Sequence, residues 1–187
     1  MSMHDEFWVF GYGSLIWRPG FEFVESVPAK LIGLHRALCV YSFVHRGTAE
    51  KPGLVLGLDR GGACRGLAYR VAPKLRENTI DYLREREQVT SVYLETYRQV
   101  ELMGEPRRHV RALVFCVDRG HEQYAGRLSL DQQLHLVRQG HGRSGPNREY
   151  VLSTVEALET LGLRDRELHL LAQALRGAHG ASTASVD

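Results

Sequence analysis

The sequence predicts an α+β fold: a small mixed β-barrel-like sheet with helices packed outside it. Three observations predict this class. Runs of β-branched and aromatic residues dominate the first half of the chain, Gly- and Pro-containing breaks separate them, and helical periodicity takes over after Ser129. The 187 residues suffice for one domain of ordinary size, so we expect a single domain over 1–176 and a disordered tail over 177–187.

The strand candidates are the apolar runs, whose residue types suit a pleated and half-buried surface. In chain order they are Phe7–Tyr12, Ala29–Phe43, Leu54–Leu58, Cys64–Val71, Tyr97–Leu102 and Val110–Val117. Between them, the segments 46–53 and 60–62 contain Gly or Pro and predict loops.

One helix interrupts the strands, and three follow them. Their predicted spans are about Lys74–Gln88, Ser129 to Gly140, Asn147 to Gly162 and Asp165 to Gly177. Ser129 begins a capping-box sequence, and Asn147 and Asp165 are typical N-cap residues.

The composition favours a soluble, cytoplasmic protein. Lys and Arg number 24 against 22 for Asp and Glu, a balance that argues against nucleic acid or a membrane surface as the main partner. No apolar run approaches the ~20 residues that cross a bilayer, and acids stand where a signal peptide needs cations. Cys39 and Cys116 lie in apolar runs, which predicts buried free thiols in a reducing compartment.

The first candidate site is the end of the first strand, where an apolar run leads directly into Gly-Tyr-Gly-Ser-Leu. Its residues are Val9, Phe10, Gly11, Tyr12, Gly13, Ser14 and Leu15. The glycines permit close approaches, so this segment could present backbone N–H groups and one hydroxyl to a small polar ligand. Ile16 stands where a dinucleotide fingerprint needs its third glycine, and no P-loop lysine follows. A plain tight turn is the alternative.

The second candidate lies on the helix at 75–88. At 3.6 residues per turn, its apolar face contains Leu75, Thr79, Ile80, Tyr82 and Leu83. Glu87 falls near the end of this face, whereas Glu85 points to water. Burial and the negative end of the helix dipole would raise the pKa of Glu87, as a general base or acid requires. The alternative is a structural ion pair with Arg86.

Other catalytic arrangements find no support in the sequence. No two of the nine histidines have the spacing of a metal pair, so we expect no metal site. His35, His45 and His141 fit surface roles. Ser14 lacks the following glycine that a nucleophile elbow requires, which argues against a Ser/His/Asp hydrolase.

Five segments together resemble the ChaC-type γ-glutamylcyclotransferase family. They are FGYGSL at Phe10–Leu15, RGT followed by PGLV within Arg46–Val55, GGACRGLAYR at Gly61–Arg70, the Arg86–Glu87 pair and GPNREY at Gly145–Tyr150. They occur in the family's order, and the similarity extends from Phe7 to Leu175. One departure is Ser91-Val92 before Tyr93, where family members commonly keep glycine.

The resemblance implies a small barrel-like fold and a single catalytic domain with no metal and no organic cofactor. The implied reaction is a step of glutathione catabolism, in which the enzyme, a lyase, converts glutathione into 5-oxoproline and cysteinylglycine. The γ-glutamyl group would bind at Val9–Leu15, and Glu87 would be the general base and acid.

This reaction implies a chemical role for Glu87 and for the segment Val9–Leu15. The α-amine of the γ-glutamyl unit must lose a proton to attack its own γ-carbonyl, and the departing cysteine nitrogen must gain one. Backbone N–H groups of residues 12–15 would stabilise the oxyanion. Two alternatives remain open: the same chemistry on another γ-glutamyl dipeptide or amine, and a non-catalytic γ-glutamyl-binding regulator. The sequence carries no signal for an oligomeric state.

Overall fold

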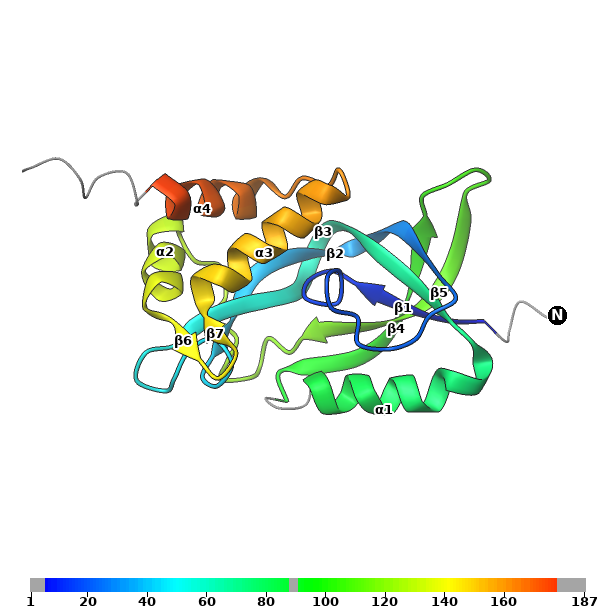
Figure 1. Ribbon diagram of the computed structural model, residues 1–187, viewed down its shortest axis with the longest axis horizontal. Helices are drawn as coiled ribbons and strands as arrows, with labels where there is room; N and C mark the ends of the chain where they lie inside the picture. The colour runs from blue at the N-terminus through cyan, green and yellow to red at the C-terminus, as the bar shows by residue number, and fades with distance from the viewer. Residues whose placement is uncertain (1–5, 88–90, 178–187) are drawn as a thin grey trace, which may run out of the picture. The chain divides into compact units, whose positions relative to one another are not determined.

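The computed structural model describes residues 6–87 and 91–177, which form a closed five-stranded barrel, a two-stranded sheet and four α-helices (Figure 1). The barrel strands are β1 (Phe7–Gly11), β2 (Glu25–Ser42), β3 (Gly53–Val71), β4 (Tyr93–Leu102) and β5 (Arg108–Val117). The other elements are η1 (Pro73–Leu75), α1 (Arg76–Glu87), α2 (Leu130–Gln139), β6 (His141–Gly142), β7 (Gly145–Pro146), α3 (Asn147–Thr160) and α4 (Arg166–Gly177). The predicted α+β class with a barrel-like sheet is confirmed.

Strand β1 closes the barrel, whose order is β1–β3–β2–β4–β5. It runs antiparallel to β3, with Val9 opposite Tyr69, and parallel to β5, with Val9 opposite Leu113. All five residues of β1 are buried, which explains why its sequence is continuously apolar rather than alternating. Neighbouring strands on both sides therefore fix the point at which β1 ends.

Strand β3 is longer than predicted. The two expected strands at 54–58 and 64–71 form one continuous strand, so the predicted break at 60–62 is wrong. Gly61 and Gly62 have φ of 97° and 66°, values that glycine adopts at little cost and that occur at β-bulges. The pair therefore alters the backbone locally without ending the strand.

Helix α1 begins two residues later than predicted, after the short η1. Its buried residues are Thr79, Ile80 and Leu83, whereas Asp81 and Glu85 are exposed, so the predicted apolar face is confirmed. On the exposed side, Arg84 Nε lies 2.7 Å from Glu95 Oε2 of β4. The pair places α1 beside β4, as Figure 1 also shows.

The chain divides into two compact units. The first comprises Met1–Ala37 and Leu56–Tyr124, and the second comprises Leu38–Val55 and Ala125–Asp187. A single domain over 1–176 therefore stays a prediction. Gly177, the first residue of the predicted disordered tail, ends α4, so its predicted disorder is wrong, and the rest of that tail lies outside the described residues.

In the second unit, α2, α3 and α4 pack against one another. Ser129 forms the predicted capping box with Gln132, and the Asp165 carboxylate accepts a hydrogen bond from the Leu168 N–H at 3.2 Å. Both of these predicted helix starts are confirmed.

Asn147 has a different role from the predicted N-cap. Pro146 is the N-cap of α3, and Asn147 is the first helical residue. Its fully buried amide accepts a hydrogen bond from the Leu54 N–H and donates one to the Leu54 carbonyl, both at 2.7 Å. The side chain therefore joins the start of α3 to β3.

Cys39 and Cys64 are buried free thiols, whereas Cys116 is only half-buried, so its predicted burial is wrong.

Within residues 6–87 and 91–177, no helix has the length and apolar character needed to span a membrane.

Replacing Asn147 tests whether its side chain joins the start of α3 to β3. We expect Asn147→Ala to lower the free energy of unfolding by about 3 kcal/mol, because both polar groups of Leu54 would stay buried without their partner. Urea unfolding followed by circular dichroism measures the change. Thr160→Ala is the matched control on the same helix, since its hydroxyl bond to the Glu156 carbonyl is exposed and its loss should change little. Equal effects of the two substitutions would contradict this role of Asn147.

Candidate active site

The chain turns immediately after β1. The Ile16 N–H donates to the Gly13 carbonyl at 2.9 Å, and the Arg18 N–H donates to the Ser14 carbonyl at 2.8 Å. In contrast, the N–H groups of Gly13, Ser14 and Leu15 donate to no other residue in the described part of the chain. Successive unpaired N–H groups of this kind suit an oxyanion or a carboxylate. We call residues 12–19 the donor turn.

Two glycines permit the close packing around the donor turn. At Gly11, a Cβ atom would lie 3.1 Å from both Leu15 Cβ and Tyr69 Cε2, tighter than ordinary contacts. Gly20 has a φ of 76°, and a Cβ atom there would collide with the Tyr82 hydroxyl. A larger residue at either position would displace the turn from the side chains behind it.

Arg86 ties the last turn of α1 to the donor turn. Its Nη1 donates to the Arg18 carbonyl at 2.6 Å and to the Pro19 carbonyl at 3.2 Å. Its Nη2 donates to the Ser14 hydroxyl at 2.8 Å. The predicted alternative of an ion pair between Arg86 and Glu87 is therefore not what the structure contains, because the guanidinium is directed to the turn.

Tyr69 holds the donor turn from β3. Its hydroxyl donates to the Leu15 carbonyl at 2.7 Å. Burial raises the pKa of Tyr69 to about 12, against a smaller lowering by the charge of Arg86, so the hydroxyl keeps its proton. Phe21 and Phe23 contact the Tyr69 ring edge-on, with centroids at 5.6 and 5.0 Å. The aromatic packing leaves this hydroxyl little freedom to turn away.

Glu87 is the residue after Arg86 and is partly buried. Desolvation by the surrounding protein raises its pKa to about 7, and the charge of Arg86 opposes this rise. Among the described residues, none forms a hydrogen bond or an ion pair with its carboxylate. A carboxyl group with this pKa can accept or release a proton at neutral pH.

The other predicted site residues differ in their surroundings. Val9 and Phe10 are fully buried in β1, and Tyr12 and Leu15 are also buried. Ser14 is half-buried, and its hydroxyl accepts the hydrogen bond from Arg86. This bond connects the predicted loop to the residue next to Glu87. A substrate-binding role for Val9–Leu15 stays a prediction.

The histidines have the surface roles that the sequence favoured. His35 Nδ1 lies 3.0 Å from the Gly61 carbonyl oxygen, His45 Nδ1 lies 3.0 Å from Ser144 Oγ, and His141 is exposed. Within the described ranges, no group of three His, Cys, Asp or Glu side chains could hold a metal ion.

Arg36 contacts the donor turn and was missed from the sequence. Its Nε donates to the Tyr12 carbonyl at 2.5 Å. The signal was available, because Leu34, Arg36 and Leu38 alternate along β2 and are all buried. A charged residue on the buried face of a strand needs polar partners, and backbone carbonyls are one source of them.

The raised pKa of Glu87 predicts a pH-dependent stability. The folded chain releases this proton near pH 7, whereas the unfolded chain releases it near 4.5. The folded state thus binds the extra proton between these values, and its stabilising effect is lost as the pH rises through 7, by up to about 3 kcal/mol. Glu87→Gln, which cannot ionise, should therefore gain stability relative to the unchanged protein as the pH rises from 4.5 to 7.

Urea unfolding midpoints at half-unit pH steps measure this difference. Glu85→Gln, two residues earlier on the exposed face, is the matched control. Parallel stability curves for the Glu87→Gln variant and the unchanged protein would show that Glu87 is not desolvated.

Comparisons with known proteins identify the family of this chain. The model of the family described as ChaC-like protein matches residues 7–177. The chain is 38% identical over 162 residues to the glutathione-specific γ-glutamylcyclotransferase of Escherichia coli K12, covering 87% of this chain and 69% of that protein. It is 33% identical over 177 residues to γ-glutamylcyclotransferase 2-3 of Arabidopsis thaliana, covering 90% and 88%.

Among solved structures, the fold matches that of a glutathione-specific γ-glutamylcyclotransferase from yeast. The TM-score is 0.84 with 22% identity, covering 92% of this chain and 96% of the yeast chain. The extent of the family match and the identity to the named relatives lead to one conclusion: the chain belongs to the ChaC-like family.

Proposed function

We propose that this chain is a γ-glutamylcyclotransferase that converts glutathione into 5-oxoproline and cysteinylglycine, with Glu87 as its general base and acid. The observation that carries the proposal is the partly buried Glu87 carboxyl group, whose pKa is near 7 and which follows the arginine that binds the donor turn. The choice of glutathione is supported by the names of relatives from Escherichia coli and other organisms.

Glu87 carries protons from the attacking nitrogen to the leaving nitrogen. Its ionised form takes a proton from the α-ammonium group of the γ-glutamyl unit, which frees the nitrogen lone pair to attack the γ-carbonyl carbon. The new C–N bond closes the five-membered ring, and the carbonyl oxygen becomes an oxyanion. The tetrahedral intermediate collapses as Glu87 gives its proton to the cysteine nitrogen, and the bond between that nitrogen and the carbon breaks. The ring nitrogen, which still carries two protons, releases one of them to the regenerated Glu87 carboxylate, which passes it to the released amine, so that cysteinylglycine leaves as an ammonium ion. Acid and base catalysis of this kind contributes about 10²–10⁴-fold.

The donor turn is the proposed oxyanion and γ-glutamyl subsite. The N–H groups of Gly13, Ser14 and Leu15 are the candidates to donate, because that of Ile16 is already bonded within the turn. Each such donor is typically worth about 3 kcal/mol to the transition state. Val9, Phe10 and Gly11 would support the subsite from β1 rather than contact the reacting atoms. The reaction needs no covalent enzyme intermediate, and we expect no metal or organic cofactor.

The purified protein should release 5-oxoproline and cysteinylglycine from glutathione, including in the presence of a chelator. Glu87→Gln should lower kcat at least about 100-fold, because the amide cannot carry the proton. Chromatography of the two products measures turnover, and circular dichroism checks that the variant is folded.

Glu85→Gln is the matched control for this experiment. It makes the same chemical change on the exposed face of α1 and should retain the activity of the unchanged protein. Normal turnover by Glu87→Gln, or an equal loss in Glu85→Gln, would refute the assignment of the catalytic carboxylate.

A substrate panel separates the glutathione proposal from its close alternative. We expect 5-oxoproline from glutathione at a kcat/KM at least about tenfold above that for γ-glutamyl-alanine and γ-glutamyl-lysine, a difference of about 1.4 kcal/mol in transition-state binding. Preference for either dipeptide would reassign the substrate and keep the chemistry. Binding of all three compounds without turnover would favour a non-catalytic γ-glutamyl regulator.

A further inference from the structure

We propose that Arg36 is a positioning residue that holds the Tyr12–Gly13 peptide so that the Gly13 N–H faces the substrate. The inference rests on the proposed function, because it assigns the Gly13 N–H to the oxyanion subsite. Arg36 lies on β2 and has no assigned part in the transfer of the proton.

The planar Tyr12–Gly13 peptide links the Arg36 contact to the direction of the Gly13 N–H. Arg36 Nε donates to the Tyr12 carbonyl at 2.5 Å. A trans peptide is planar, and its C=O and N–H bonds point in opposite directions. The Tyr12–Gly13 peptide is trans, since the cis peptide in the described residues is Glu105-Pro106. Binding the Tyr12 carbonyl therefore directs the Gly13 N–H away from Arg36.

The sequence around this peptide explains why it needs a clamp. Tyr12 lies between Gly11 and Gly13, and glycine allows a neighbouring peptide to rotate at little steric cost. If the peptide rotated by half a turn, the Tyr12 carbonyl would point to the place intended for the oxyanion. A carbonyl dipole in that place would repel the developing negative charge. Orientation of this one peptide thus decides whether the subsite attracts or repels it.

Arg36 is well placed to act as a rigid clamp. It is 9% exposed, and its Nη2 donates to the Arg65 carbonyl of β3 at 2.6 Å. Arg65 stands two residues before Leu67, which pairs with Gly11 at the end of β1. The guanidinium therefore fixes the turn relative to the strand beside it. Lysine could reach one carbonyl but lacks the planar fork that binds both.

Kinetics of Arg36→Met and Arg36→Lys test the proposal. Loss of one oxyanion donor lowers kcat by about 10²–10³-fold, so we expect Arg36→Met to lose at least tenfold in kcat while KM changes less than threefold. Arg36→Lys should recover part of this loss, because an ammonium can still bind the Tyr12 carbonyl.

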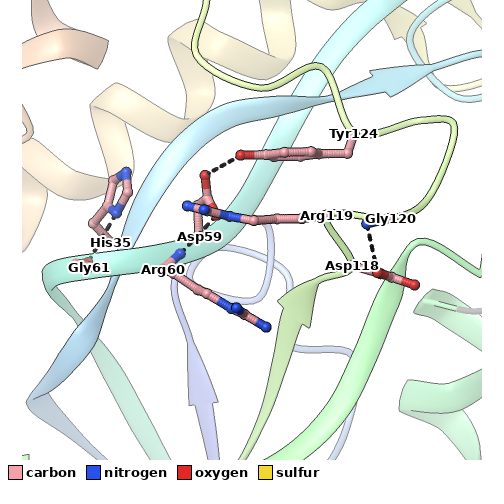
Figure 2. Close-up of polar contacts among 8 residues, drawn as sticks. All are labelled: His35, Asp59, Arg60, Gly61, Asp118, Arg119, Gly120 and Tyr124. Carbon is pink, nitrogen blue, oxygen red and sulfur yellow. Dashed lines mark hydrogen bonds and ion pairs between the residues drawn. The ribbon is translucent and has the colours of Figure 1, made fainter.

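Arg119→Met is the matched control in the same unit. Figure 2 shows Arg119 and Tyr124 directed at the Asp59 carboxylate, with Arg119 Nε at 2.6 Å and the Tyr124 hydroxyl at 2.7 Å. Burial of Asp59 raises its pKa, but the hydrogen bonds from Arg119 and Tyr124 outweigh this effect and hold the pKa below its usual value. The cluster is therefore a charged structural brace. Both Arg36→Met and Arg119→Met should lower the urea unfolding midpoint, because each removes buried or partly buried hydrogen bonds of a guanidinium. Arg119→Met should leave kcat and KM unchanged.

A measurement without turnover distinguishes this inference from the proposed function. In ¹⁵N-labelled Glu87→Gln protein, added glutathione should shift the Gly13 amide resonance, and the further change Arg36→Met should abolish that shift. Without ligand, Arg36→Met should move the Gly13 amide resonance and Arg119→Met should not.

No 5-oxoproline from the unchanged protein would refute the proposed function, while the ligand-free Gly13 resonance would still report on the clamp. Activity with equal kcat losses in the Arg36→Met and Arg119→Met variants would overturn the positioning role, because both losses would then follow stability. An unmoved Gly13 resonance in Arg36→Met would overturn it as well.

Discussion

The candidate site depends on one constraint, the attachment of the donor-turn backbone to side chains from three separate elements. Arg36 of β2 binds the Tyr12 carbonyl, Tyr69 of β3 binds the Leu15 carbonyl, and Arg86 of α1 binds the carbonyls of Arg18 and Pro19. Because a peptide is planar, holding the Tyr12 carbonyl also directs the Gly13 N–H, and the other two attachments hold the rest of the turn backbone in place. A turn that contains Gly13 and lies between Gly11 and Gly20 thereby acquires the rigidity of the sheet and helix around it.

The same attachment explains the raised pKa of Glu87. Had Arg86 formed a direct ion pair with its neighbour, the charge would have lowered the pKa of the carboxyl group. Its donors are instead directed to two carbonyls and the Ser14 hydroxyl, so desolvation dominates and the pKa rises to about 7. One arginine thus fixes the turn and leaves the next residue basic enough to take a proton. This coupling gives a physical reason for the adjacent Arg-Glu pair.

How far the sequence predicts this structure depends on how local each signal is. Periodicity in α1 predicted the inward Glu87, and the capping box predicted the start of α2, because both depend on residues within a turn or two. The role of Asn147 could not be predicted, since its partner Leu54 lies 93 residues away. The predicted strand break at Gly61-Gly62 was wrong because a barrel strand can contain glycines with left-handed φ angles. The contacts of Arg86 were equally non-local, although its position on the helix was predictable.

The departure from the family pattern at Ser91-Val92 has a backbone explanation. Ser91 adopts a left-handed φ of 53°, a conformation that costs a non-glycine residue about 1 kcal/mol or more. Val92 is fully buried, and its carbonyl accepts a hydrogen bond from the Asp118 N–H at 2.8 Å. Burying the valine side chain offsets a cost of that size, since it stabilises by about 1.5–3 kcal/mol. The chain therefore keeps a glycine-like turn at Ser91 and gains apolar packing at Val92, which fixes the start of β4 against the end of β5.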